Sequence, residues 1–150
     1  MSQEATLAAG TIVSYSLALD TPVWVVLEGT LSVGSVGFMA EAKERTTLAD
    51  TNKKYGAGLQ DAPDKTVKGQ YYGSNTDQTA FLKAAEATQT ILMQVQYPDK
   101  PNETGTGTIA EFEVATLGYE LDDVTGEDWM MFTVNGKQNS ITWTDPVAGV

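Results

Sequence analysis

The chain has 150 residues, enough for one domain with a hydrophobic core of its own. Its net charge is −11, from nine basic and twenty acidic residues, and Arg45 is its single arginine. Proteins that bind duplex DNA neutralise phosphates with lysine and arginine, so this balance argues against a DNA-binding protein. The absence of cysteine and histidine excludes disulfides, thiolate chemistry, imidazole bases and most zinc sites.

The first residues, MSQEATLAAG, do not resemble a secretory signal, because Glu4 stands where basic residues are expected and no long apolar run follows. We therefore predict no export signal, and we interpret the sequon at Asn102–Thr104 as an ordinary surface segment. No stretch is apolar over the length that a membrane-spanning helix needs.

Strand signals dominate the N-terminal part. Residues 11–19 alternate apolar and polar side chains, and residues 22–29 form a β-branched and aromatic run typical of a buried strand, which puts Trp24 in the core. Residues 35–44 also alternate. The alternation predicts a core face of Val36, Phe38 and Ala40 and an opposite face of Met39, Glu41 and Lys43.

The next segment, RTTLADTNKKYGAGLQDAPDKTVKG at Arg45–Gly69, has almost no apolar periodicity. We predict a long loop between strands at about 45–66. Connections without secondary structure that exceed about 12–15 residues are uncommon in compact domains and are usually functional or disordered. Six of the nine basic residues lie in or beside this loop: Lys43, Arg45, Lys53, Lys54, Lys65 and Lys68.

A strand at 66–73 and a helix at about 75–89 follow. Asn75 is placed to cap the helix, with Gln78 at the third helical position as in a capping box. The spacing of Gln78, Phe81, Leu82 and Ala85 predicts one face that lies across a sheet.

The C-terminal half again reads as strands. Residues 90–97 alternate, residues 106–121 form a long strand with a bend near Gly118, and residues 128–144 are predicted to be a hairpin that turns at Asn135-Gly136. The whole chain is therefore predicted to be one mainly β domain, an antiparallel sandwich or barrel with a single flanking helix.

The order of these parts resembles the major tail tube protein of long-tailed bacteriophages with non-contractile tails. The likeness covers about residues 30–145 and is strongest in TTLADTNKKYGAGLQDAPDKTVKGQYYG (46–73), with the helix behind it, and in YELDDVTGEDWMMFTVNGK (119–137). The inner tubes of contractile tails are close relatives.

The resemblance implies a structural protein of the virion, assembled in the host bacterial cytoplasm, without catalytic activity or cofactor. Six subunits would form a ring, and rings would stack into a hollow tube that holds the tape measure protein, ends at terminator and distal tail proteins, and conducts DNA. The loop at 45–66 would reach a neighbouring ring, and an N-terminal arm at 1–11 would contact other subunits.

Two sets of contact residues follow from this expectation. The loop is relatively basic, whereas residues 99–128 carry a net charge of −8, so complementary charges would set the register between subunits. Tyr55 and Leu59 are the expected apolar anchors. The loop contacts are predicted to be Leu48, Lys53, Lys54, Tyr55, Leu59 and Asp61, and the acidic docking turn Asp122, Asp123, Glu127 and Asp128.

The expected lumen is anionic, so that DNA slides past without binding. Alternation in TIAEFEVAT puts Glu111 and Glu113 opposite Phe112 and Val114, facing either the lumen or solvent. The predicted lumen-facing residues are Glu41, Lys43, Glu111 and Glu113.

The same residues bear on other functions. The acids of LDDVTGED do not have EF-hand spacing, so we interpret this segment as a charged turn. Glu111 and Glu113 have the separation of a glycosidase pair, but no pocket signal accompanies them. A pilus or capsid-decoration subunit also fits a β-sandwich with a long loop. A carbohydrate-binding module would stack sugars on Trp24, Trp129, Trp143, Tyr71 and Tyr72.

Overall fold

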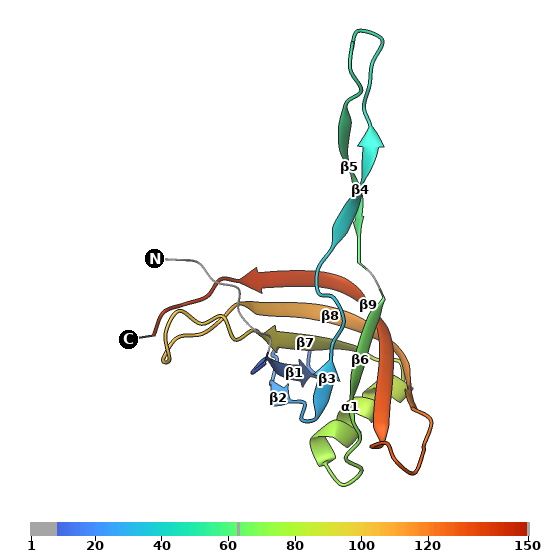
Figure 1. Cartoon of the computed structure of the whole chain (residues 1–150), viewed down its shortest axis with the longest axis vertical. Coiled ribbons are helices and arrows are strands. Elements are labelled where there is room, and N and C mark those ends of the chain that lie inside the picture. Colours follow the sequence, from blue (N-terminus) through green and yellow to red (C-terminus); the bar gives the residue numbers. More distant parts are fainter. Residues whose placement is uncertain (1–8, 63, 150) are drawn as a thin grey trace.

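The computed structural model describes residues 9–62 and 64–149 as a mainly β fold with one helix, which confirms the predicted fold class (Figure 1). A seven-stranded antiparallel sheet forms a curled half-barrel, and a separate two-stranded hairpin projects from it. The elements are β1 (Ile12–Ser16), β2 (Val25–Val26), β3 (Thr30–Ser32), β4 (Met39–Glu44), β5 (Tyr55–Asp61), β6 (Lys65–Gln70), α1 (Thr76–Glu86), β7 (Thr90–Gln96), β8 (Ile109–Leu121) and β9 (Met131–Thr144).

The strand order of the large sheet is β2-β1-β7-β8-β9-β6-β3. Its two edge strands, β2 and β3, are consecutive in the chain, so the sheet must curl until its edges approach each other. Backbone hydrogen bonds hold this corner: Leu27 N donates to Val13 O at 2.8 Å, and Gln70 N donates to Gly29 O at 2.8 Å.

The core lies between α1 and the inner face of this sheet. Strands β7 and β8 alternate buried and half-buried residues along most of their length, as a sheet with one covered face requires. The Phe81 ring of α1 lies 5.3 Å from the Tyr15 ring and 6.5 Å from the Phe132 ring. The predicted core faces of residues 90–97, of residues 106–121 and of the helix are confirmed by the buried Ile91, Met93, Val95, Phe112, Val114, Gln78, Phe81, Leu82 and Ala85.

The helix begins as predicted, with the Asn75 side chain accepting a hydrogen bond from Gln78 N at 3.0 Å. The capping box is only half right, because the Gln78 side chain turns inward. It accepts from Tyr72 N at 2.6 Å and donates to Gln70 O at 2.7 Å. Gln78 thus joins the helix to the end of β6.

The predicted buried strand at 22–29 is wrong. Only Val25 and Val26 form a strand, Val23 and Val26 are exposed, and Trp24 is half-buried. The run forms a short sheet edge that no further strand covers: Leu27 is buried in the core and Val25 packs against it, whereas Val23 and Val26 face out of the single chain.

The predicted hairpin at 128–144 is also wrong, because β9 runs through Asn135-Gly136 without turning. Gly136 pairs with Thr116 of β8 and with Lys65 of β6. A Cβ atom at Gly136 would lie 2.7 Å from Val114 Cγ1, so glycine is needed for close packing and not for a turn. The turn lies between β8 and β9 instead.

The long loop predicted at 45–66 is largely a hairpin. Strand β5 covers 55–61 and pairs antiparallel with β4, and β6 begins at Lys65, so only residues 45–54 form the connecting loop. The strand was missed because no core covers either face of this hairpin, and apolar alternation is therefore absent. The strand predicted from residue 35 begins only at Met39.

Candidate assembly surfaces

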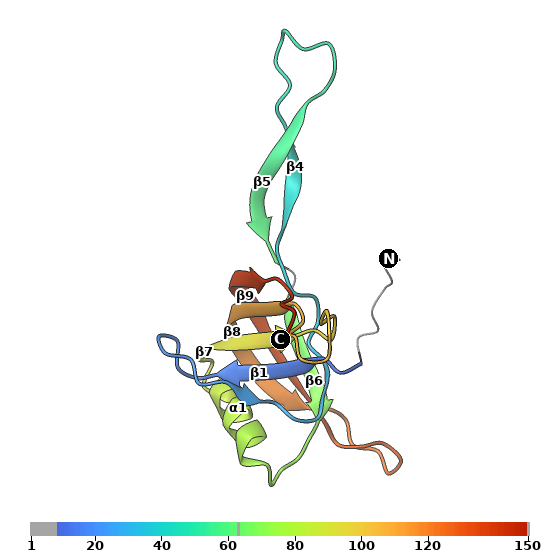
Figure 2. The same ribbon diagram turned by 90° about the vertical axis from the view of Figure 1, so that its left-hand side faces the viewer.

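The β4–β5 hairpin extends along the long axis of the molecule, away from the half-barrel (Figures 1 and 2). In both views α1 and the loop between β8 and β9 lie at the opposite end. The molecule therefore has two different ends, and the hairpin is the far point of one of them.

The hairpin exposes large apolar side chains. Leu48 is fully exposed, Leu59 is 92 % exposed and Met39 is 83 % exposed, and the Tyr55 ring is also largely open to solvent. Clustered exposed apolar side chains mark interaction sites more often than ordinary surface. The predicted anchors Leu48, Tyr55 and Leu59 are therefore accessible to a partner.

The hairpin tip, residues 45–54, has an internal hydrogen-bond network. Asp50 accepts from Thr47 N at 2.8 Å and forms an ion pair with Lys54 at 3.0 Å. The Thr47 N–H and the Lys54 ammonium hold the pKa of Asp50 below its ordinary value. Lys53 and Arg45 form no ion pair with any residue the structure describes, so these two cations are free for a partner.

Asp61, the remaining predicted loop contact, lies at the other end of β5, beside the body of the molecule. Its carboxylate accepts from Ala62 N at 2.9 Å. The structure thus separates Asp61 from the tip residues with which it was grouped.

The root of the hairpin contains a buried lysine that sequence reasoning assigned to the basic loop. Lys65 is only 1 % exposed, and its Nζ donates to Ser35 O at 2.9 Å and lies 4.6 Å from the centre of the Phe112 ring. Burial lowers the pKa of Lys65 to about 8. The alternation of Lys65 with the inward-facing Val67 was the signal that could have located it.

Gln138 completes the root. Its Nε2 donates to Ser35 O at 3.0 Å, and its Oε1 accepts from Gly37 N at 3.2 Å. Lys65 and Gln138 therefore hold the segment that leads into β4 against β6 and β9. Their contacts fix the direction in which the hairpin leaves the body.

The outer face of the sheet carries Glu111 and Glu113, opposite the buried Phe112 as predicted. Glu111 accepts from Gln94 at 3.2 Å, and Glu113 accepts from Asn139 at 3.4 Å. Their direct cross-strand neighbours are uncharged: Leu92, Gln94, Ser140 and Thr142.

Glu41 and Lys43, the other two predicted lumen residues, belong to β4 of the projecting hairpin. They lie on a different sheet from Glu111 and Glu113. The structure therefore does not bring the four predicted lumen residues onto one surface.

The predicted acidic turn is the loop between β8 and β9. Asp122 accepts from the Thr133 hydroxyl at 2.7 Å and Asp128 from the Thr125 hydroxyl at 2.8 Å, whereas Asp123 and Glu127 are exposed. Within residues 9–62 and 64–149, no three acidic side chains are grouped as a metal site requires. The same loop exposes Trp129, which sequence reasoning considered only as a sugar-stacking residue.

The aromatic residues of the carbohydrate alternative do not form one platform. Trp129 precedes β9 and Trp143 lies near its end, so the length of a 14-residue strand separates them. At about 3.3 Å per residue this distance is on the order of 40 Å. That alternative is not favoured.

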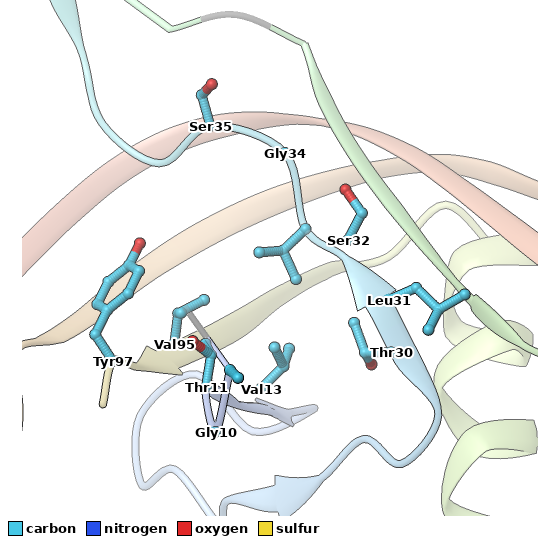
Figure 3. Close-up of a pocket in the computed structure, with 12 residues that line it drawn as sticks. Gly10, Thr11, Val13, Thr30, Leu31, Ser32, Gly34, Ser35, Val95 and Tyr97 are labelled. Atoms are coloured by element: carbon cyan, nitrogen blue, oxygen red, sulfur yellow. The ribbon is translucent and has the colours of Figure 1, made fainter. Parts of the chain in front are cut away.

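A groove of about 530 Å³ lies where the half-barrel is open, between the N-terminal half of β1 and the β3 edge (Figure 3). Val13 and Val95 form part of its floor, and the backbone of Thr30–Ser35 forms one wall. Gly10 and Thr11, the end of the predicted N-terminal arm, also line it. Residues 1–8 of that arm lie outside the described residues.

Comparison with known proteins decides the family. The sequence matches the phage tail tube protein family over residues 6–146, almost the whole chain. The chain belongs to the phage tail tube protein family. It is therefore a structural tail protein, as the sequence resemblance implied. A comparison with curated proteins found no match.

Solved structures of tail-like assemblies share the fold of this tail tube protein. A chain from the anti-feeding prophage baseplate is 10% identical with a TM-score of 0.72, covering 97% of this chain and 98% of that chain. A chain from the tail of an empty GTA particle, refined with C6 symmetry, is 16% identical with a TM-score of 0.65, covering 93% and 99%. A chain of the sheath/tube terminator structure of a PVC extracellular contractile injection system is 8% identical with a TM-score of 0.67, covering 95% and 98%.

The one helix of the described residues, α1, has 11 residues and is too short to cross a membrane.

Proposed function

We propose that this tail tube protein assembles as six-membered rings that stack into a hollow tube, and that its role is structural and not catalytic. The observation that carries the proposal is the projecting hairpin with its exposed Leu48, Tyr55 and Leu59. A hairpin that buries no side chain within its own chain gains stability by packing against another copy. The 6-fold and C6 symmetry stated for two structural neighbours supports rings of six.

The hairpin is proposed to join neighbouring rings. It projects along the long axis, and its tip presents Lys53, Arg45 and the apolar Leu48 far from the half-barrel. Because the two ends of the molecule differ, end-to-end contacts repeat in one direction and extend a filament without closing.

Contacts within a ring are proposed to use the open edge of the half-barrel. The groove between β1 and β3 lies beside backbone that no strand of the large sheet covers on that side. An extended segment of a neighbouring subunit would add there by backbone pairing. The N-terminal arm, whose last residues line this groove, is proposed to take part in these contacts.

The outer face of β7, β8 and β9 is proposed to line the lumen. Its charges include the carboxylates of Glu111 and Glu113 and the ammonium of Lys137, which pairs across from Ala115 of β8 and forms an ion pair with Asp64. The two carboxylates repel phosphates over roughly 8 Å at physiological salt, and the ion pair with Asp64 offsets the charge of Lys137. The lumen would hold the tape measure protein during assembly and conduct DNA afterwards.

Terminator and distal tail proteins are the further proposed partners, with assembly in the host cytoplasm before the tail joins the virion. A tail without a contractile sheath remains a prediction from the sequence, because structural neighbours include contractile injection systems.

Negative-stain microscopy of the concentrated protein tests this function. The wild-type chain is expected to form hollow filaments of uniform width, and Leu48→Ser with Leu59→Ser is expected to stop at rings or monomers. Val147→Ser is a matched control, since Val147 is an exposed apolar residue of the body. A wild-type chain that stays monomeric under all conditions, or a double variant with unchanged filaments, contradicts the proposal.

A further inference from the structure

A second exposed apolar surface lies at the end of the molecule opposite the hairpin. It consists of four residues at the end of β8 and on the loop between β8 and β9, which we call the Trp129 surface: Leu121, Val124, Trp129 and Met130. Trp129 is 79 % exposed and Val124 is 68 % exposed. Figures 1 and 2 both place this loop at the end away from the β4–β5 hairpin.

The size of Trp129 is the first argument that another molecule covers this surface. An indole open to water leaves one of the largest apolar side chains unburied, and tryptophan is enriched among residues that dominate binding energy. Three further exposed apolar side chains within residues 121–130, at the end of β8 and on the loop, make it a patch and not an isolated exposed residue.

Charge identifies the occupant. Four acidic residues lie between the apolar residues of the Trp129 surface in the sequence, and residues 121–130 contain no lysine or arginine. The acidic residues are Asp122, Asp123, Glu127 and Asp128. The hairpin tip carries Arg45, Lys53 and Lys54 against one acid, Asp50, which Lys54 neutralises within the tip. The tip therefore offers two unpaired cations beside exposed leucine and tyrosine side chains. Its cations complement the carboxylates of the loop between β8 and β9, and its apolar side chains complement the apolar residues of the Trp129 surface.

We propose that the Trp129 surface receives the β4–β5 hairpin tip of a second copy of this chain. The inference rests on the proposed tube function and names the surface that completes each end-to-end contact. Trp129 packs against the apolar side chains of the tip, and Arg45 and Lys53 lie against Asp123 and Glu127. The apolar contact supplies most of the affinity, whereas the charges set register and speed association. Because donor and receptor lie at opposite ends of one chain, the contact propagates along an open filament.

Charge reversal tests the pairing. Lys53→Glu with Arg45→Glu, and separately Asp123→Lys with Glu127→Lys, are each expected to raise the critical concentration for filament growth at least about tenfold in low salt. The four changes in one chain restore growth, because every copy then carries both reversed surfaces. Glu103→Lys is the matched control, since Glu103 is an exposed acid on the loop before β8 and is expected to have no effect.

A cross-linking experiment locates the contact directly. The chain has no cysteine, so Lys53→Cys with Glu127→Cys introduces the only two thiols. A short bis-maleimide is expected to give a ladder of covalent oligomers from assembled filaments, because each copy is joined at both ends. Lys53→Cys with Glu103→Cys is expected to give no ladder.

The apolar part is tested by Trp129→Ser, expected to raise the critical concentration at least about tenfold while the far-UV circular dichroism spectrum stays unchanged. Filaments that tolerate Trp129→Ser and both charge reversals, or that cross-link through residue 103 and not residue 127, overturn this inference and leave the tube function standing. A wild-type chain that never polymerises overturns the function itself.

Discussion

At the residue scale, Lys65 is the least expected feature of this protein. It is an almost fully buried cation that forms no ion pair with any described residue, and it is held by Ser35 O and the Phe112 ring. Burial of an unpaired charge costs free energy, which is why the pKa of Lys65 falls to about 8 from its ordinary 10.5.

This pKa predicts a pH-dependent stability. Between pH 8 and 10.5 the folded chain has lost a proton that the unfolded chain keeps, so the free energy of unfolding rises with pH at about 1.4 kcal/mol per unit from this group. Denaturant unfolding of the unassembled protein is expected to show about 2 kcal/mol more stability at pH 9.5 than at pH 8. Below pH 8 both states carry the proton, and the contribution is flat.

Lys65→Met provides the control. The thioether side chain fills a similar volume without charge, and Gln138 still satisfies Ser35 O. The variant is expected to lack the rise above pH 8 and to be at least as stable as the wild type at pH 7. If the stability of the wild type and of the variant changes in parallel with pH, the rise above pH 8 does not come from Lys65.

Gln78 is the second residue whose role depends on burial. It is 1 % exposed, and its amide bonds Tyr72 N and Gln70 O. Gln78→Leu leaves these backbone groups unpaired, so we expect a loss of about 2–3 kcal/mol in unfolding free energy. Gln89→Leu, at an exposed position after the helix, is expected to change stability by less than about 0.5 kcal/mol. Equal effects of the two changes are the result that contradicts this prediction.

At the element scale, β9 shows how one local signal can carry two meanings. Asn-Gly is the preferred hairpin turn, yet here Gly136 lies where β8, β9 and β6 pair side by side. A hydrogen in place of a side chain lets Val114 and the Ala115 carbonyl approach within 3 Å of the missing Cβ position. Only the neighbouring strands distinguish a turn glycine from a packing glycine.

Gly136→Ala tests this reading of β9. The added methyl group meets backbone as well as a side chain, so we expect a loss of about 1–3 kcal/mol in denaturant unfolding. Gly126→Ala is the matched control, because nothing lies within 4 Å of its Cβ position and its φ is not in the left-handed region. If Gly136 were in a free turn, the two variants would behave alike.

The strands that were predicted well and those that were missed differ in what covers them. Alternation located β7 and most of β8, and helical spacing located α1, because the same chain buries Ile91, Phe112 and Phe81. Val23 and Val26 of the apolar run at 22–29 and the featureless β5 misled the prediction for one reason: this chain does not cover them. Sequence pattern records that a side chain is apolar, not whether its own chain or another copy will bury it.

At the scale of the whole molecule, the same reasoning accounts for the candidate surfaces. Leu48, Tyr55 and Leu59 were predicted as contacts and are exposed, whereas Trp129 was assigned to a different function. The position of the Trp129 loop at the far end of the molecule follows from the path of β8 and β9, which no short motif encodes. The sequence indicates which residues can make contacts between subunits. Only the fold shows that the hairpin and the Trp129 loop lie at opposite ends of the molecule.

Whether Glu111 and Glu113 line the lumen depends on which way the sheet faces in the tube. If the outer face of β8 lines the channel, Glu111→Lys with Glu113→Lys makes the channel wall cationic, and filaments should then retain short duplex DNA in low salt. That DNA should be protected from DNase, since the wall encloses it. Glu86→Lys with Glu103→Lys makes the same change in net charge at exposed positions away from this face, so any DNA it retains should be digested. Nuclease-sensitive DNA on the Glu111 and Glu113 variant would mean that this face points outward, and the acidic lining would then have to come from another surface.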